Sequence, residues 1–349
     1  MQETTIYLIR HAEAEGNLYR RIHGHYDTNV TENGLRQIAA LEERFRDVPI
    51  DAVYSSDLTR TCRTARAVAD PKGLEIRKDP RFREISLGVW EDMPFGELAQ
   101  TDGAQLNNFS YNPMYWRTEG AETFQEYTDR FLDGLQSLTV VHPGQTVAVF
   151  THGGVMSGAI SRLFAEEELR HSDNTAVTKL RYDGSWHLDY AGDNSHLTPE
   201  ISTLGRQNWW RREGLRTDAN LWFLPFEGEI EWYLRLSDSR TPVAPMAVMN
   251  FAMLGTDPIG FVQLDPQRGQ EEGVGFIDYL GLEEKYRGQG LGVQMIGCAV
   301  SHYRKLGRHA LQIYLPERFA KTEQFFLRDG FRPTGGGYYE KCILVPDGR

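Results

Sequence analysis

The sequence is poor in cysteine, has no low-complexity tract and has no apolar run near the roughly 20 residues that a membrane-spanning helix needs. Its three cysteines, Cys62, Cys298 and Cys342, fit neither a zinc-binding pattern nor a disulfide framework. The start, MQETTIYLIRHAEAE, lacks the basic and apolar regions of a secretory signal. We therefore expect a cytoplasmic protein that has no membrane partner.

Positive charge is also scarce, since 38 Lys and Arg stand against 49 Asp and Glu, giving a formal net charge of −11. This balance argues against broad nucleic-acid binding, which depends on neutralising phosphates with basic side chains. A phosphorylated ligand would be repelled at long range, but salt screens exposed charges beyond about 8 Å. Any phosphate site must then be basic locally.

The length of 349 residues exceeds the usual 100 to 200 residues of one domain and predicts two. The apolar periodicity lapses into a polar stretch at 193–204, so we place the boundary between domains 1–205 and 206–349. The aromatic run from Trp209-Trp210 to Trp222 follows, either as a joint between the halves or as part of one core.

In the first half, short apolar runs at 6–9, 52–55 and 146–150 alternate with helical patterns at 31–45, 57–69 and 124–138. Thr31 and Asp57 stand where N-caps belong. Leu35, Ile38, Leu41 and Phe45 recur along one helical face and predict a core contact. This alternation predicts an α/β domain with a mostly parallel sheet covered by helices.

In the second half, strands are expected at 247–254, 259–264 and 275–282, followed by a glycine-rich turn and a helix at 291–303. A strand at 310–315 and a helix at 322–327 complete the pattern.

Phosphate-binding side chains follow three separate strands of the first half. Arg10 and His11 come after the first strand, His152 follows the strand at 146–150, and Arg60 lies in the first turn after 52–55. Ligands of open α/β sheets collect outside the carboxyl ends of strands, so these groups can converge. The alternative for any single histidine is local packing or capping.

Five motifs carry a resemblance: LIRHAEAEGN, SSDLTRTCRTA, REISLGVWED, GAETFQEYTDR and FTHGG. In this order they resemble the histidine phosphatase, or phosphoglycerate mutase-like, superfamily over about residues 4 to 200. The resemblance implies a three-layer α/β/α domain and hydrolysis of a small phosphorylated metabolite without a cofactor or metal ion.

By matching position, the resemblance implies that His11 is the nucleophile, that Arg10, Arg60 and His152 hold the phosphoryl oxygens, and that Glu84 protonates the leaving oxygen. Asn17 would support the bound phosphate, and Arg21 and Gly153 are further substrate-binding candidates. For Arg20, Arg21 and His23 a solvated basic loop is an equal alternative.

The chemistry sets conditions on these groups. A phosphate dianion needs positive charge, which the two arginines and a protonated His152 would supply. The attacking His11 must instead be neutral, with its proton directed at a backbone carbonyl. The segment between Glu84 and Gly120 is short for a phosphoglycerate mutase, so hydrolysis is preferred and mutase-type phosphoryl transfer is the alternative.

The glycine-rich turn of the second half reads Arg287-Gly288-Gln289-Gly290-Leu291-Gly292 and opens a helix. Free N–H groups at such a helix start suit a pyrophosphate. With the strand before it and Asp329-Gly330-Phe331 after it, the region resembles a GNAT-family N-acetyltransferase domain over about residues 206 to 349, with a mixed, mostly antiparallel sheet. The resemblance implies acetyl-CoA bound by Leu280, Leu282 and the turn.

One part of the GNAT pattern is missing. Phe325-Phe326 stands where such enzymes commonly have a tyrosine that protonates the departing thiolate, and Phe319 replaces an upstream asparagine. Tyr314, Tyr338 or Tyr339 could substitute, and Asp278 could serve as the base. The second half is then either an acetyltransferase with an unknown amine acceptor, or a module that binds coenzyme A or only packs on the first half.

Overall fold

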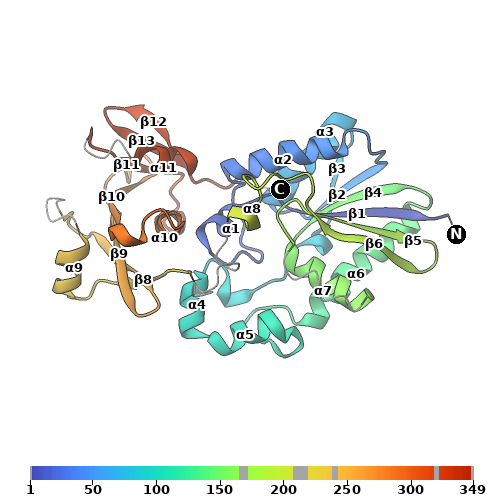
Figure 1. Cartoon of the computed structure of the whole chain (residues 1–349), viewed down its shortest axis with the longest axis horizontal. Helices are drawn as coiled ribbons and strands as arrows, with labels where there is room; N and C mark the ends of the chain where they lie inside the picture. Colours follow the sequence, from blue (N-terminus) through green and yellow to red (C-terminus); the bar gives the residue numbers. More distant parts are fainter. Residues whose placement is uncertain (1, 165–171, 207–218, 238–242, 318–321, 347–349) are drawn as a thin grey trace.

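The computed structural model describes residues 2–164, 172–206, 219–237, 243–317 and 322–346. Two domains lie side by side, each built on its own sheet (Figure 1). No described helix is both long and apolar enough to cross a membrane.

The sheet of the first domain has the strand order β3-β2-β4-β1-β5-β6. β1 (Thr4–Arg10), β4 (Thr146–Thr151), β2 (Ala52–Ser55) and β3 (Ile76–Lys78) run parallel. β5 (Val177–Tyr182) is antiparallel to β1, and β6 (Trp186–Asp193) pairs antiparallel with β5 at the edge of the sheet. The structure therefore confirms the strands predicted at 52–55 and 146–150, the second of which extends to residue 151, and it confirms the mostly parallel sheet.

Helices cover both faces of this sheet. α2 (Glu32–Phe45) and α3 (Thr59–Lys72) pack with Phe150 on one face, and α6 (Phe124–Val141) and α7 (Gly153–Phe164) pack with Val149 on the other. The neighbouring β4 residues Val149 and Phe150 thus pack into cores on opposite faces of the sheet, as the two-residue period of a strand requires. The result is the expected α/β/α arrangement.

Shorter elements border the carboxyl ends of the strands. They are α1 (Glu15–Tyr19), η1 (Pro80–Phe82), η2 (Gly88–Trp90), α4 (Phe95–Thr101), α5 (Gly103–Tyr111), η3 (Pro113–Tyr115) and α8 (Thr203–Arg206).

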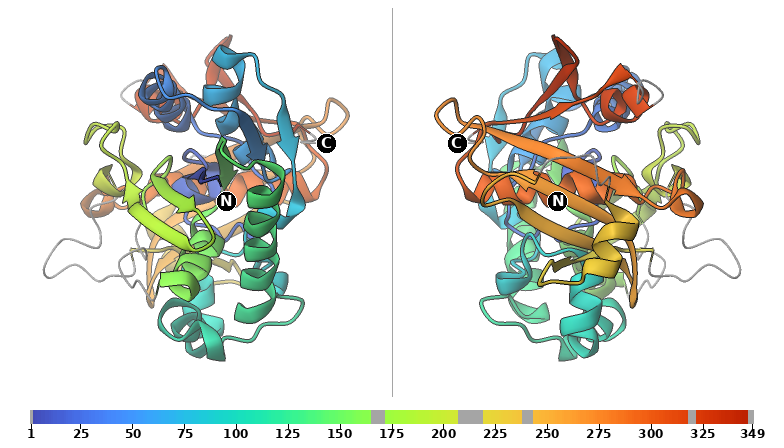
Figure 2. Two further views of the ribbon diagram at one scale, coloured as in Figure 1. Left: turned by 90° about the vertical axis from the view of Figure 1, so that its right-hand side faces the viewer. Right: turned by 90° about the vertical axis from the view of Figure 1, so that its left-hand side faces the viewer.

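The second sheet is mixed and mostly antiparallel, with the order β12-β13-β11-β10-β9-β8-β7, and only β10 and β11 pair in parallel. Its strands are β7 (Trp222–Pro225), β8 (Val248–Leu254), β9 (Asp257–Asp265), β10 (Val274–Leu282), β11 (Ala310–Tyr314), β12 (Arg332–Gly335) and β13 (Tyr338–Cys342). The helical elements are α9 (Ile230–Leu236), η6 (Glu284–Tyr286), α10 (Gly292–Lys305) and α11 (Glu323–Arg328). Figure 2 shows this sheet crossing behind the first domain.

Some local predictions are confirmed and others are wrong. Thr31 caps α2 by accepting the Gly34 N–H. Asp57 is not an N-cap, because Leu58 holds that position and the Asp57 carboxylate pairs with Arg83 instead. Leu35 is 37% exposed rather than a core residue.

The domain boundary remains a prediction. α8 packs on the first domain through the Thr203 hydroxyl, which donates to Glu13, and β7 begins the second sheet at Trp222. Trp222 packs against the second domain's own core. Trp209, Trp210 and Phe319 lie outside the described residues.

The two domains meet closely where α1 crosses α10. A Cβ added to Gly297 would lie 2.5 Å from the Tyr19 Cβ, so only glycine permits this approach. The Tyr19 hydroxyl donates to Asp329 at 3.1 Å and accepts from the Lys341 ammonium at 2.6 Å. The buried Tyr19 phenol of the first domain thus contacts the ion pair of Asp329 and Lys341 in the second domain.

Candidate active site

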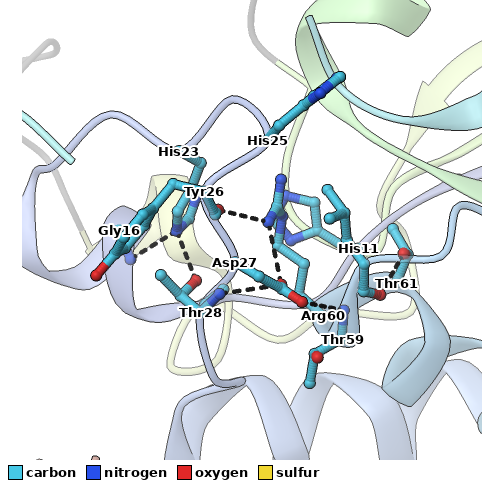
Figure 3. A network of polar contacts seen from close by, with 12 residues as sticks. His11, Gly16, His23, His25, Tyr26, Asp27, Thr28, Thr59, Arg60 and Thr61 are labelled. Carbon is cyan, nitrogen blue, oxygen red and sulfur yellow. Dashed lines mark hydrogen bonds and ion pairs between the residues drawn. The ribbon is translucent and has the colours of Figure 1, made fainter. Parts of the chain in front are cut away.

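The predicted site residues come together beyond the carboxyl ends of β1, β2 and β4. The His11 and His152 rings are 5.2 Å apart between centroids, and both side chains are buried. Arg60 is fully buried at the start of α3. Figure 3 shows Arg60 beside His11, under the segment that follows α1.

His11 is arranged as a neutral imidazole. Its Nδ1 lies 2.7 Å from the carbonyl oxygen of Ala12, so the proton sits on Nδ1 and Nε2 keeps its lone pair. Burial, followed by the charges of Arg60 and Arg10, holds the pKa of His11 well below its usual range. The prediction of a neutral ring whose proton is directed at a backbone carbonyl is confirmed.

Three buried nitrogen atoms around His11 have no hydrogen-bond partner within the described part of the chain: Arg10 Nε, Arg60 Nε and His152 Nδ1. One outer nitrogen of Arg10 and both outer nitrogens of Arg60 are engaged elsewhere. Arg10 donates to the Ser172 carbonyl, and Arg60 donates to the Gly24 carbonyl at 2.7 Å and the Tyr26 carbonyl at 3.1 Å. Since buried polar groups are normally paired, the two arginine Nε–H groups fit an anion, and the Nδ1 of His152 would fit one once it is protonated.

His152 is neutral in this arrangement. The prediction of a protonated ring concerns the site with phosphate bound, and it stays a prediction. Burial lowers its pKa well below the usual value, and the charge of Arg60 lowers it further. The Thr61 hydroxyl donates to the Leu58 carbonyl, so the Thr61 oxygen can accept from the Ser56 hydroxyl. The Ser56 oxygen in turn accepts from Nε2 of His152 at 2.8 Å. This chain leaves the lone pair on Nδ1.

Backbone amides hold Glu84 beside the two arginines. Its Oε1 accepts from Val155 N at 2.7 Å and Ile85 N at 3.1 Å, and its Oε2 accepts from Gly154 N at 3.1 Å. The negative charge of Glu84 acts on both Arg10 and Arg60. The carboxyl is therefore fixed at the first turn of α7, directly after His152.

Asn17 and Gly153 lie beside the residues of this cluster, and their part in substrate binding stays a prediction. The Asn17 Oδ1 accepts from Ala14 N at 3.0 Å and from Asn174 Nδ2 at 3.3 Å, and Asn174 also donates to the His11 carbonyl. A Cβ at Gly153 would lie 3.0 Å from Arg10 Nε. Glycine thus leaves room for this arginine.

The glycine-rich turn of the second domain lies exposed between η6 and α10. Gly288 and Gly290 have φ of +75° and +79°, a conformation that side chains disfavour. The β10–β11 pairing ends at Ile277 and Ile313, so the strands diverge before Leu280 and Leu282. Arg287 donates to the Leu282 carbonyl at 2.9 Å and ties the turn to β10.

Comparisons with known proteins agree with both arrangements. The model of the histidine phosphatase superfamily (branch 1) matches residues 6–193. The chain belongs to the histidine phosphatase superfamily. The acetyltransferase (GNAT) family model matches residues 208–331, so this histidine phosphatase domain is fused to a GNAT domain.

Several relatives resemble only the histidine phosphatase domain. The probable phosphoglycerate mutase GpmB of Salmonella typhi is 32% identical over 213 residues, which are 58% of this chain and 99% of that protein. The structure of Bacillus stearothermophilus YhfR is 33% identical, with a TM-score of 0.53, and covers 55% of this chain and 98% of its own. A putative alpha-ribazole-5'-P phosphatase from Escherichia coli str. K-12 substr. MG1655 is 26% identical, with a TM-score of 0.50, covering 54% and 96%.

Arg21, a predicted substrate-binding residue, pairs with other protein groups at the domain junction. Its Nε donates to Asp92 at 2.8 Å, and its Nη2 donates to Ser301 of the GNAT domain at 3.0 Å. Arg20 likewise donates to Asn220 at 2.9 Å. Both arginines face the domain junction.

His23, from the same segment, does reach the site. Its ring centroid is 6.0 Å from that of His11, and its Nε2 accepts from Gly16 N at 2.8 Å (Figure 3). Burial and the charges of Arg60, Arg10 and Arg304 lower its pKa well below the usual value. Sequence reasoning missed Asp27, whose carboxylate lies 3.4 Å from Arg60 and accepts from Thr59 N at 2.7 Å. No local pattern marks this aspartate.

Proposed function

We propose that the histidine phosphatase domain hydrolyses a small phosphate monoester through a phosphohistidine on His11, without a metal ion. The observation that carries the proposal is the set of three unpartnered buried nitrogens, on Arg10, Arg60 and His152, around a histidine whose Nε2 is a lone-pair donor. A phosphoryl group placed among them would meet the positive charge of the two arginines beside the lone pair of His11.

In the first step, Nε2 of His11 attacks phosphorus and the bond from phosphorus to the ester oxygen breaks. Glu84 gives its proton to the departing oxygen, and the alcohol leaves. The Ala12 carbonyl stabilises the Nδ1–H of the ring as positive charge develops on it.

In the second step, water attacks the phosphohistidine and gives a proton to Glu84, so His11 and the protonated Glu84 are regenerated and inorganic phosphate is released. Arg10 and Arg60 hold the phosphoryl oxygens through both steps. His152 acquires a proton when the dianion enters, because the added negative charge opposes the effect of Arg60 on its pKa.

The test is release of p-nitrophenol from p-nitrophenyl phosphate in EDTA. His11→Ala should abolish turnover, whereas His187→Ala, a change of an exposed histidine in β6, should leave it intact. Turnover that needs an added metal ion, or that persists in His11→Ala, would refute the proposal.

Phosphoglycerate mutase activity is the second candidate, because the Salmonella typhi relative carries that name. The name of the Escherichia coli relative favours a phosphatase. The two are separated by incubating the protein with 3-phosphoglycerate and resolving 2-phosphoglycerate from inorganic phosphate. Isomer formation without phosphate release would replace hydrolysis by phosphoryl transfer.

For the GNAT domain we propose transfer of acetyl from acetyl-CoA to an amine. The pyrophosphate would be held by the turn from Arg287 to Gly292, and the pantetheine would enter where β10 leaves β11, beside Leu280 and Leu282. The acceptor amine would then reach Asp278, whose pKa is raised by burial. The alternative is a domain that binds coenzyme A or packs structurally without transfer.

Among the replacement acids, Tyr314 has the most suitable position. It follows Ile313, the last β11 residue paired with β10, and is 46% exposed. The Tyr339 hydroxyl donates to Glu323, and Tyr338 accepts from Arg268 at 2.9 Å. Phe326 is buried against Phe331 and cannot act. Release of free thiol from acetyl-CoA with a panel of amines should fall in Tyr314→Phe, while coenzyme A affinity stays unchanged.

A further inference from the structure

The segment from Glu15 to Asn29, which follows the nucleophile, is closed on itself. The Asn29 N–H donates to the Glu15 carboxylate at 3.2 Å, and the Glu15 N–H donates to the Asn29 carbonyl at 3.0 Å. Across the segment, His23 accepts from Gly16 N and lies 2.9 Å from the Thr28 hydroxyl (Figure 3). Glu15 thus sits at the base of a loop whose two ends it joins.

This loop sets the orientation of Arg60. The carbonyl oxygens of Gly24 and Tyr26 and the carboxylate of Asp27 take the outer guanidinium nitrogens. Only Nε remains without a partner, among the described residues, to face the phosphoryl site. Any displacement of the loop would therefore rotate the group that holds phosphate.

The GNAT domain fastens the base of this loop through Arg304, in the last turn of α10. Its Nη2 donates to the Glu15 Oε2 at 2.6 Å, and its Nε donates to the Ile343 carbonyl at 2.7 Å. Both members of the pair are buried, with 11% of the Arg304 side chain and 3% of the Glu15 side chain exposed. The guanidinium thus joins the end of the second sheet to the loop.

Neighbouring contacts hold the same region. The Asn29 amide donates to the Leu344 carbonyl at 2.9 Å, and the Thr59 hydroxyl donates to the Pro346 carbonyl at 2.9 Å. Lys341 lies 3.9 Å from the other oxygen of Glu15, so Arg304 is its nearer cationic partner. Removing the Arg304 charge leaves the carboxylate with the Asn29 N–H and, among the cations of the described residues, with the more distant lysine.

We infer that Arg304 of the GNAT domain is a positioning residue of the histidine phosphatase site, acting through Glu15 and the loop on Arg60. The inference rests on the proposed phosphatase function. It requires no contact between Arg304 and substrate. The GNAT domain then contributes to the histidine phosphatase site, because Arg304 helps to hold the loop that orients Arg60.

The experiment compares Arg304→Gln, Arg304→Lys and Arg332→Gln in the full chain. Arg332 is the matched control, because it forms another ion pair between the domains, with Glu32 at 2.6 Å, but that pair is half-exposed and its carboxylate belongs to α2 rather than to the loop. Hydrolysis of p-nitrophenyl phosphate gives kcat and KM across pH, and calorimetry gives the affinity for inorganic phosphate and for coenzyme A.

Arg304→Gln should lower kcat/KM about 10- to 100-fold, the loss expected when a catalytic group is misplaced by about 1 Å. Phosphate affinity should fall with it, Arg304→Lys should recover part of both, and coenzyme A affinity should not change. Arg332→Gln should stay near the parent protein in every readout. Glu15→Gln should add little to Arg304→Gln, because the two side chains act as one unit.

Parent-like kcat/KM and phosphate affinity in a folded Arg304→Gln protein would overturn the inference, as would equal losses in Arg304→Gln and Arg332→Gln. Absence of turnover in the parent protein would instead refute the proposed phosphatase function. In that case phosphate affinity decides the inference: weaker phosphate binding in Arg304→Gln alone supports it, and unchanged binding rejects it.

Discussion

The Val155 amide donates to the Glu84 carboxyl at 2.7 Å, which ties the candidate general acid to the helix that starts directly after His152. One turn of α7 therefore fixes both the acid and the neighbour of a phosphate-binding histidine. The carboxyl is held by backbone amides on both of its oxygens rather than by a flexible side chain.

Glu84→Gln should slow hydrolysis of alkyl phosphates by about 10² to 10⁴ but affect p-nitrophenyl phosphate much less, since p-nitrophenolate leaves without a proton. The measurement is kcat for the two ester classes in parent and variant. Equal losses for both classes would show that Glu84 positions the site rather than donating a proton.

Phosphate binding should be accompanied by uptake of about one proton at His152, because Nδ1 carries a lone pair in the neutral ring and must be protonated to donate to a phosphate oxygen. Calorimetry in buffers of different ionisation enthalpy, at a pH where phosphate is a dianion, gives the proton number. Proton uptake should vanish in His152→Gln. Binding by the parent with no proton uptake would contradict a protonated, donating His152.

Gly290→Val should weaken coenzyme A binding at least about tenfold, because the side chain would enter the space where the pyrophosphate must approach backbone N–H groups. Gly73→Val is the matched control, since Gly73 also has a positive φ, of +64° against +79°, and neither Cβ would meet an atom within 4 Å. Equal affinities in the two variants would place coenzyme A elsewhere.

Asp329→Asn should gain stability relative to the parent protein as the pH rises from about 4 to about 7. Burial raises the pKa of Asp329 from 3.8 to about 6, against the opposing charge of Lys341. A pKa that is higher in the folded state contributes stability that is complete below about 3.8 and is lost as the pH rises through about 6. Asparagine does not ionise and avoids this loss.

The measurement is the difference in free energy of unfolding between Asp329→Asn and parent at the two pH values, with the exposed Asp133→Asn as control. If the variant instead loses stability relative to the parent protein at the higher pH, the ion pair with Lys341, at 3.1 Å, outweighs the cost of burying the charge.

Much of the fold followed from the sequence because hydrophobic periodicity is a local property. Residues 52–55 and 146–151 are buried strands with short apolar runs, and α2 shows its amphipathic period and the Thr31 cap in the sequence itself. Asp57 misled the prediction because an aspartate before a helix is equally suited to an ion pair, and Arg83 lies close enough to take it.

The residues at the centre of the candidate site were also visible in the sequence, because His11, His152 and Arg60 each follow a strand and the ends of parallel strands meet at one edge. What the sequence could not determine depends on atoms far apart in the chain. The protonation of His152 depends on the charge of Arg60, and Arg21 turned toward Asp92 and Ser301 because the GNAT domain lies there.

The sequence by itself determined two α/β domains, their order and the residue types of each site, because these depend on local period and motif. Only the tertiary structure decided which basic side chains face phosphate and which face the other domain. The physical reason is that electrostatics and hydrogen bonding act through space, so the contact of Arg304 with Glu15, 289 positions apart, leaves no local signal in either segment.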